Sequence, residues 1–142
     1  MNGCQTVCSA TLNALAGIGN YVWEDIDHDG QQDDFEPAIP NVTVHLKNAA
    51  GVIIATTTTD ANGEYYFLSL PAGTYSVQFV IPEGMDYTAS NTGNDALDSD
   101  IVLGMMGMTG TYTLDPGELD FTVDAGLFVR TRMVLSLTLV LV

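Results

Sequence analysis

The chain has 142 residues, of which 46% are hydrophobic, so it can build a core, and intrinsic disorder is disfavoured. Eighteen acidic side chains oppose three basic ones and give a formal net charge of −15. This charge disfavours nucleic acids and anionic membranes as partners, favours divalent cations, and is in keeping with an extracellular setting where calcium is plentiful.

Residues 1–17 are interpreted as an irregular N-terminal arm. The arm lacks a basic segment followed by a long apolar run, so it is not a complete secretory signal. Its two cysteines, Cys4 and Cys8, cannot form a four-ligand zinc site alone. They are either two partly buried thiols or a disulfide, within the chain or to another copy, and the sequence leaves both alternatives open.

The first strand is predicted over residues 18–23, and an acidic stretch over 25–36 follows it directly. Carboxylates occupy positions one, three, five, nine and twelve of this stretch, and glycine occupies position six. This is the ligand spacing of a calcium loop, in which position seven offers its backbone carbonyl, position nine binds directly or through water, and position twelve uses both carboxylate oxygens. Gly30 would permit the sharp turn. The predicted ligands are Asp25, Asp27, Asp29, Gln31, Asp33 and Glu36.

A bound ion would explain why so many carboxylates lie in one short loop. Residues 25–36 contain no lysine or arginine, so a divalent cation would offset the repulsion among the carboxylates. Calcium fits better than magnesium, because the predicted ligand set is large and comes wholly from the protein, whereas magnesium retains several waters. The alternative is a solvated acidic turn, since Asp, Asn and Gly are also common in ordinary loops.

Both flanks of this calcium loop are predicted to be strands, whereas helices flank the loop of an ordinary calcium hand. After the loop, Val42, Val44 and Leu46 alternate with polar residues and indicate a strand over residues 41–47. Turn residues then separate further short segments that are rich in β-branched and aromatic side chains. The strands predicted from these segments are 52–59, 64–70, 74–81, 110–114 and 119–127, with a long polar connection over 85–100. Many short strands without a sustained helical period predict an all-β sandwich.

The order of these motifs resembles that of a known family. The segments that carry the resemblance are 18–25, the calcium loop through Pro37, 42–46, 57–65, 70–75, 94–100 and 123–128. In this order they resemble the calcium-binding B repeats of serine–aspartate-repeat bacterial surface adhesins, which belong to the wider group of collagen-adhesin B-type, prealbumin-like domains. The resemblance implies an immunoglobulin-like β-sandwich over residues 18–128, located at the cell surface and used as a rigid stalk or spacer stiffened by calcium. It does not imply an enzyme.

The resemblance also raises a second calcium site, because family B repeats are thought to hold more than one ion. Its candidate ligands are Asp95, Asp98 and Asp100 in the long connection, beside Asn94 and near a possible approach of Asp60 or Asp124. Judged from the residues alone, a carboxylate-rich loop of this kind is more often simply solvated.

An internal isopeptide bond is not expected. Relatives that form one place a lysine in the first strand, but that strand has none here, and Lys47 lies in the second strand. Asp124 could stand in only for the acceptor.

An apolar segment, residues 133–142, lies beyond the region of resemblance, within a C-terminal stretch over 129–142. One face of an extended strand would carry Leu135, Leu137, Leu139 and Leu141. The segment is too short for a membrane span, which needs about 20 apolar residues. It would either join its own sheet or complete the sheet of a neighbour as a donor strand. We favour the neighbour, because the family domain is complete without this strand, and head-to-tail exchange of this kind builds filaments.

Catalysis has little support in the sequence. No serine or cysteine nucleophile has a base partner in a motif. His28 occupies a non-ligand position of the calcium loop, and His45 alternates with apolar residues and is expected to face outward. Asn41 begins a triplet that fits a glycosylation acceptor, although such triplets are common by chance.

Two functions remain, and both are extracellular. The first is structural: a calcium-stabilised subunit of a surface filament, stalk or matrix, whose partners are other copies bound through the C-terminal strand or neighbouring repeat domains. The second is an adhesin module that binds a host or neighbouring-cell ligand through its loops. The apolar segment favours the first function. Cytoplasmic calcium sensing is disfavoured, because no helix pair is predicted that could open.

Overall fold

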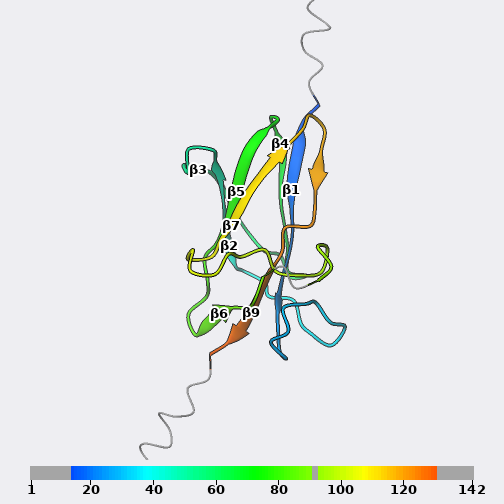
Figure 1. The fold of residues 1–142 in the computed structure, drawn as a ribbon, viewed down its shortest axis with the longest axis vertical. Helices are drawn as coiled ribbons and strands as arrows, with labels where there is room; N and C mark the ends of the chain where they lie inside the picture. The colour runs from blue at the N-terminus through cyan, green and yellow to red at the C-terminus, as the bar shows by residue number, and fades with distance from the viewer. Residues whose placement is uncertain (1–13, 91–92, 131–142) are drawn as a thin grey trace, which may run out of the picture.

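A computed structural model describes residues 14–90 and 93–130, which form two β-sheets packed as a sandwich (Figure 1). The predicted all-β sandwich is therefore confirmed. The strands are β1 (Ala16–Glu24), β2 (Thr43–Asn48), β3 (Ile53–Thr58), β4 (Glu64–Leu70), β5 (Gly73–Phe79), β6 (Met85–Tyr87), β7 (Met108–Leu114), β8 (Leu119–Asp120) and β9 (Ala125–Val129). The described part of the chain holds no helix long and apolar enough to cross a membrane. Cys4, Cys8 and residues 133–142 lie outside the described residues.

Strand β1 organises the first sheet. This five-stranded sheet has the order β4–β1–β9–β6, with β8 also paired to β1, and the four-stranded second sheet has the order β3–β2–β5–β7. β1 is antiparallel to β4 but parallel to β8 and β9. The start of β1 and the end of β9 lie at opposite ends of the long axis (Figure 1). The domain thus spans the distance between the points where the chain enters and leaves it.

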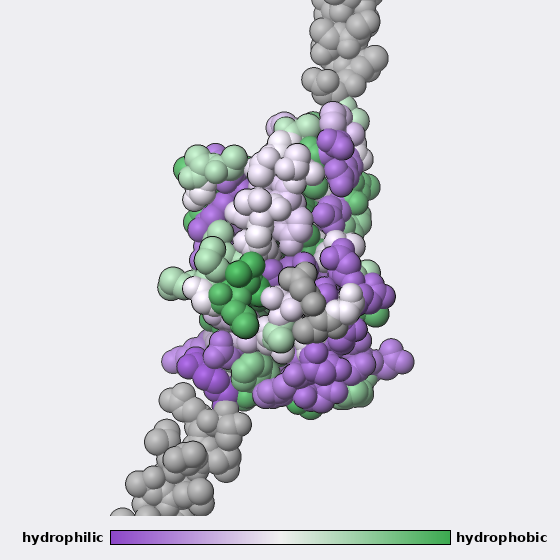
Figure 2. Space-filling model, viewed as in Figure 1, coloured by the Kyte–Doolittle hydropathy of each residue, from purple (hydrophilic) through white to green (hydrophobic). Residues whose placement is uncertain are grey.

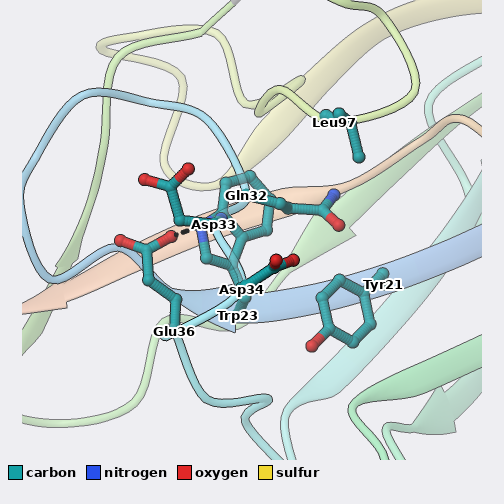
Figure 3. Close-up of a pocket in the computed structure, with 7 residues that line it drawn as sticks. All are labelled: Tyr21, Trp23, Gln32, Asp33, Asp34, Glu36 and Leu97. Atoms are coloured by element: carbon teal, nitrogen blue, oxygen red, sulfur yellow. Dashed lines mark hydrogen bonds between the residues drawn. The ribbon is translucent and has the colours of Figure 1, made fainter.

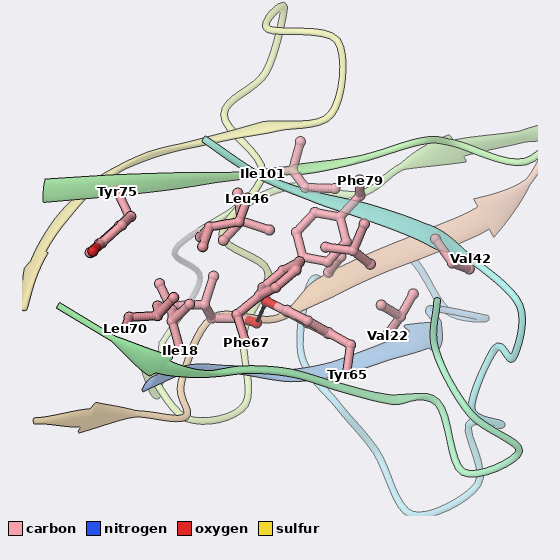
Figure 4. Close-up of a cluster of buried hydrophobic side chains, with 14 of the residues drawn as sticks. Ile18, Val22, Val42, Leu46, Tyr65, Phe67, Leu70, Tyr75, Phe79 and Ile101 are labelled. Atoms are coloured by element: carbon pink, nitrogen blue, oxygen red, sulfur yellow. Dashed lines mark hydrogen bonds between the residues drawn. The ribbon is translucent and has the colours of Figure 1, made fainter. Parts of the chain in front are cut away.

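Alternating apolar side chains from both sheets meet in one core (Figure 4). Val77 and Phe79, two residues apart in β5, are fully buried because period-two positions share one face of a strand. Tyr65 of β4 meets the rings of Phe67 and Phe79 edge-on, with centroid distances of 6.0 and 5.5 Å. Its hydroxyl donates a 2.6 Å hydrogen bond to the carbonyl of Val123. This buried bond ties β4 to the segment before β9.

Two parts of the strand prediction need correction. The predicted strand over 119–127 is divided into β8 and β9 by residues 121–124, where the Asp120 carboxylate accepts hydrogen bonds from the backbone N–H and hydroxyl of Thr122 at 3.2 and 2.7 Å. The predicted polar connection over 85–100 contains β6, which pairs antiparallel with β9. Strands this short depend on their partners more than on their own sequence.

Candidate metal centre

The calcium loop, residues 25–36, leaves the end of β1, and the sheet fixes its base. The N–H of Asp25 donates to the carbonyl of Leu127 in β9 at 2.7 Å, and the N–H of Glu24 donates to the carbonyl of Pro37 at 2.8 Å. Trp23 also forms an isolated antiparallel bridge with Ala38. The predicted strand-flanked loop is therefore what the structure contains.

The first loop carboxylate, that of Asp25, is fully buried and points into the loop. Its Oδ2 atom accepts a 2.8 Å hydrogen bond from the N–H of Gly30, and Oδ1 accepts one of 3.2 Å from the N–H of Asp29. Gly30 has φ of 81°, in the left-handed region that suits glycine. Position six thus reverses the chain around the side chain of position one, as the spacing predicted.

The last loop carboxylate, that of Glu36, closes the loop from the other side. It is 8% exposed, and its two oxygens accept hydrogen bonds of 2.7 and 3.1 Å from the N–H groups of Ile26 and Asp33. Figure 3 shows the Glu36 carboxylate beside Asp33. Because each oxygen binds a different part of the loop, Glu36 joins its two halves.

The carboxylates of the loop fall into two overlapping groups. One oxygen from each of Asp25, Asp27 and Glu36 lies within 4.8 Å of the others, and the same holds for Asp27, Asp29 and Asp33. Asp27 belongs to both groups. All five predicted carboxylate ligands are therefore brought together by the fold, as crowded oxygen donors that suit a hard cation.

The fold also brings together the residues of the second predicted site, in the connection between β6 and β7. Oxygens of Asp95, Asp98 and Asp100 lie within 4.8 Å of one another, and Asp98 and Asp100 are 2% and 8% exposed. Gln31 forms an isolated antiparallel bridge with Asp98, which attaches this group directly to the calcium loop. The two acidic groups are therefore neighbours in the fold.

Asp124 approaches the second group, as the sequence suggested, and is fully buried. Its N–H donates to Oδ2 of Asp100 at 2.8 Å, and the N–H of Asp100 donates back to its carbonyl at 2.8 Å. The Asp124 carboxylate accepts from the N–H of Tyr21 and from Nε2 of Gln32, both at 3.0 Å. Gln32 was not a predicted site residue, and it links the calcium loop to Asp124.

Asp60 does not join this group. Its carboxylate accepts hydrogen bonds from the N–H groups of Asn62 and Glu64 at 2.8 and 3.0 Å, within its own turn. Of the two residues suggested by the sequence, the fold brings only Asp124 to the second group.

Burial and mutual repulsion change the acidity of these carboxyl groups. Burial, together with the charges of Asp98 and Asp95, raises the pKa of Asp100 to about 7, and burial with the charge of Asp100 raises the pKa of Asp124 to about 8. Burial would also raise the pKa of Asp25, but hydrogen bonds from Thr88, Gly30 and Asp29 outweigh it and keep that pKa below its usual value. These crowded carboxylate oxygens lack compensating positive charge, which a divalent cation would supply.

The calcium loop rests on an aromatic platform from β1. Tyr21 and Trp23 stack with centroids 6.4 Å apart, and Trp23 is fully buried. A hollow of about 140 Å³ separates these rings from the loop, and Figure 3 shows its lining of Tyr21, Trp23, Gln32, Asp33, Asp34, Glu36 and Leu97. The two rings therefore line one side of the hollow, and residues of the calcium loop line the other.

Sequence comparison identifies the family to which this chain is similar. A family model described as the SdrD B-like domain matches residues 16–127. Serine-aspartate repeat-containing protein F of Staphylococcus epidermidis is 46% identical over 112 residues, which cover 78% of this chain and 6% of that protein. Bone sialoprotein-binding protein of Staphylococcus aureus is 41% identical over 111 residues, covering 78% and 9%. The chain thus spans less than a tenth of either relative.

Comparison of structures supports the fold alone. The minor pilin GBS52 of Streptococcus agalactiae matches with a TM-score of 0.52 at 12% identity, over 84% of this chain and 47% of that one. The shared feature is a two-sheet immunoglobulin-like domain.

Proposed function

Because the chain belongs to the family of SdrD B-like domains, we propose that it is a calcium-stabilised structural module of a cell-surface stalk, filament or matrix. The family consists of non-enzymatic modules of serine-aspartate repeat surface adhesins, and its staphylococcal members are cell-surface proteins. The predictions of family, surface location and absence of catalysis are therefore confirmed. The bound ion, its ligands and the mode of assembly are the parts proposed here.

The geometry of the calcium loop carries the proposal. Asp25 and Glu36, the first and last ligands by spacing, are both buried with their oxygens turned into the loop. Asp27, Asp29 and Asp33 would complete the side-chain ligands, and Gln31 would add its carbonyl. An all-oxygen, largely protein-derived ligand set of this size favours calcium over magnesium. Asp95, Asp98 and Asp100 would hold a second ion next to the first.

A bound ion would act on stability. It would hold in place the loop that leaves β1, and this loop contacts the connection before β7 through Gln31 and Asp98 and β9 through Asp25 and Leu127. A stalk must transmit load without bending at such junctions, and an ion that crosslinks them would stiffen the domain.

Calorimetric titration of the metal-free chain with calcium tests the proposal. Two binding events are expected, together with a much weaker response to magnesium. The variant Asp25→Ala should lose one event and keep the other. Absence of any calcium binding, or equal affinity for magnesium, would contradict the proposed metal centre. A single event that Asp25→Ala abolishes would contradict the second ion.

The assembly part of the proposal concerns the apolar segment, residues 133–142. Its period-two leucines would pair with the sheet of a neighbouring copy. A head-to-tail arrangement of such pairings would extend into a filament, whereas a two-fold arrangement would close as a dimer. Deleting residues 133–142 should leave a soluble, folded monomer. An unfolded or insoluble deletion product would instead assign the segment to its own domain.

A further inference from the structure

A second hollow, away from the metal centre, lies where β5 ends beside β6. It measures about 440 Å³ and is lined by Gln78, Phe79, Val80, Ile81, Tyr87 and Met106. Five of these six side chains are apolar or aromatic, so the hollow suits an apolar occupant rather than an ion. We call this hollow the acceptor groove.

The loop that forms one wall of the acceptor groove is fixed in shape. The N–H of Gly104 donates to the hydroxyl of Tyr87 at 2.9 Å, and Nε2 of Gln78 donates to the carbonyl of Met106 at 3.2 Å. Met106 has φ of 55°, and Gly107 has φ of 83° in a position where a Cβ atom would collide with the Phe79 carbonyl. The wall is therefore a built feature and not a loosely packed turn.

Large apolar side chains on this wall face solvent. Leu103, Met105 and Met106 are 61%, 48% and 79% exposed, and Val80 in the groove is 45% exposed. Figure 2 shows hydrophobic atoms gathered at the left edge of the molecule, where the loop between β6 and β7 projects in Figure 1. Contiguous exposed apolar surface beside a groove is typical of an interaction site.

The chain itself carries a segment of matching chemistry that starts beside the groove. β9 pairs with β6 with Met85 opposite Val129, and the N–H of Arg130 donates to the carbonyl of Gly84 at 2.8 Å. Tyr87 of the groove belongs to the same strand, β6. Residues 133–142, with their leucines on one face, therefore begin within a few residues of the acceptor groove.

The sequence at this point argues against a return of the segment to its own groove. Strand β9 ends with Val129 opposite Met85 and leads away from Tyr87, so the chain would have to reverse direction after Arg130 to reach its own groove. Residues 131–134, Thr-Arg-Met-Val, contain no Gly, Pro, Asn, Asp or Ser, the residues that make tight turns. We therefore expect residues 133–142 to pair with another copy rather than with their own groove.

We propose that the acceptor groove binds residues 133–142 of a second copy, and that two copies exchange these segments reciprocally to form a closed dimer. The inference rests on the pairing of the segment with a neighbour proposed above, and it adds the acceptor and the symmetry. The described chain ends at Arg130, next to β6 and the acceptor groove, so two copies that meet at this end could satisfy both grooves at once. An isologous contact of this kind closes at two and does not grow into a filament.

The test measures molar mass by light scattering across a concentration series of the intact chain with calcium present. A dimer is expected. Val80→Asp in the groove and Leu137→Asp in the segment should each raise the dimer dissociation constant by about 100-fold, because each places two charges in the symmetric interface. The matched controls are Leu68→Asp, at a side chain 57% exposed on β4, and Thr138→Asp, on the other face of the segment. Both controls should remain dimeric, and melting curves should show that all four variants fold.

The other outcomes would overturn all or part of the inference. An intact chain that stays monomeric, or that grows beyond a dimer, overturns the inference. If Leu137→Asp abolishes the dimer but Val80→Asp does not, strand exchange still holds, and the acceptor groove is the wrong binding site. These results are separate from the calcium titration, so the metal centre stands or falls independently of the dimer.

Discussion

At the scale of single residues, Asp25 is the side chain on which the calcium loop depends most. Its buried carboxylate accepts hydrogen bonds from both Asp29 and Gly30, so Asp25→Ala removes a proposed ligand and the acceptor of the Gly30 N–H, whereas the Asp29 N–H keeps its bond to Asp27. We expect calcium affinity at this loop to fall at least tenfold, which corresponds to about 1.4 kcal/mol. Calorimetry measures this change. Asp34→Ala is the control, because Asp34 is exposed and lies outside the predicted ligand set. Equal losses in the two variants would contradict the assigned role.

The buried pair Asp100 and Asp124 predicts how stability depends on pH when calcium is removed. Their pKa values of about 7 and about 8 exceed the ordinary value of 3.8, so the folded state binds more protons than the unfolded chain between about pH 4 and pH 8. This contribution to stability is complete below the unfolded pKa and is lost as pH rises through 7 and 8. In chelator, the melting temperature should therefore fall from pH 5 to pH 9.

The variant Asp124→Asn provides the control for that pH dependence. It should flatten the fall between about pH 4 and pH 8 in chelator, because an amide has no proton to lose. Saturating calcium should also reduce the slope, since the ion would take the place of the protons. A melting temperature that rises with pH in chelator would refute the assignment.

At the scale of elements, the turn before β4 supports the calcium loop from outside. Gly63 has φ of 74°, and a Cβ atom there would lie 2.6 Å from the Val22 carbonyl and 2.7 Å from Cβ of Ala38. Gly63→Ala should destabilise the fold by about 3 kcal/mol and weaken calcium binding, because Ala38 follows the loop. Gly51→Ala, at φ of 81° with open space around it, should cost about 1 kcal/mol and leave calcium affinity unchanged. Chemical denaturation and calorimetry compare the two, and equal effects would refute the contact with the loop.

The elements also show what the sequence can and cannot predict. The gathering of the loop carboxylates could be predicted, because they all lie within 25–36 and local spacing encodes their approach; their role as calcium ligands stays a prediction. The core strands were predicted because alternation is local too. β6 and the break between β8 and β9 were missed, since they depend on pairing and on one side chain, Asp120. The link from Gln32 to Asp124 joins residues 92 positions apart, and only the topology brings them together.

At the scale of the whole molecule, calcium should raise the stability of the entire domain. An ion that binds only the folded state adds about 2.7 kcal/mol at a hundredfold excess over its dissociation constant. For a domain of this size, chelation should lower the melting temperature by about 10 °C. Amide exchange should accelerate mainly over residues 24–37 and 93–100, where the acidic groups lie. Unchanged melting and exchange in chelator would remove the structural role of calcium.

The pairing of β1 with β9 has a mechanical consequence. These strands are parallel neighbours, with Val22, Trp23 and Glu24 opposite Ala125, Gly126 and Leu127, and the chain enters through one and leaves through the other. Tension applied to the two ends pulls the strands in opposite directions along their length. The backbone hydrogen bonds between the two strands are then loaded together in shear and cannot break one after another. A tethered copy should consequently resist force as one unit until this ladder ruptures.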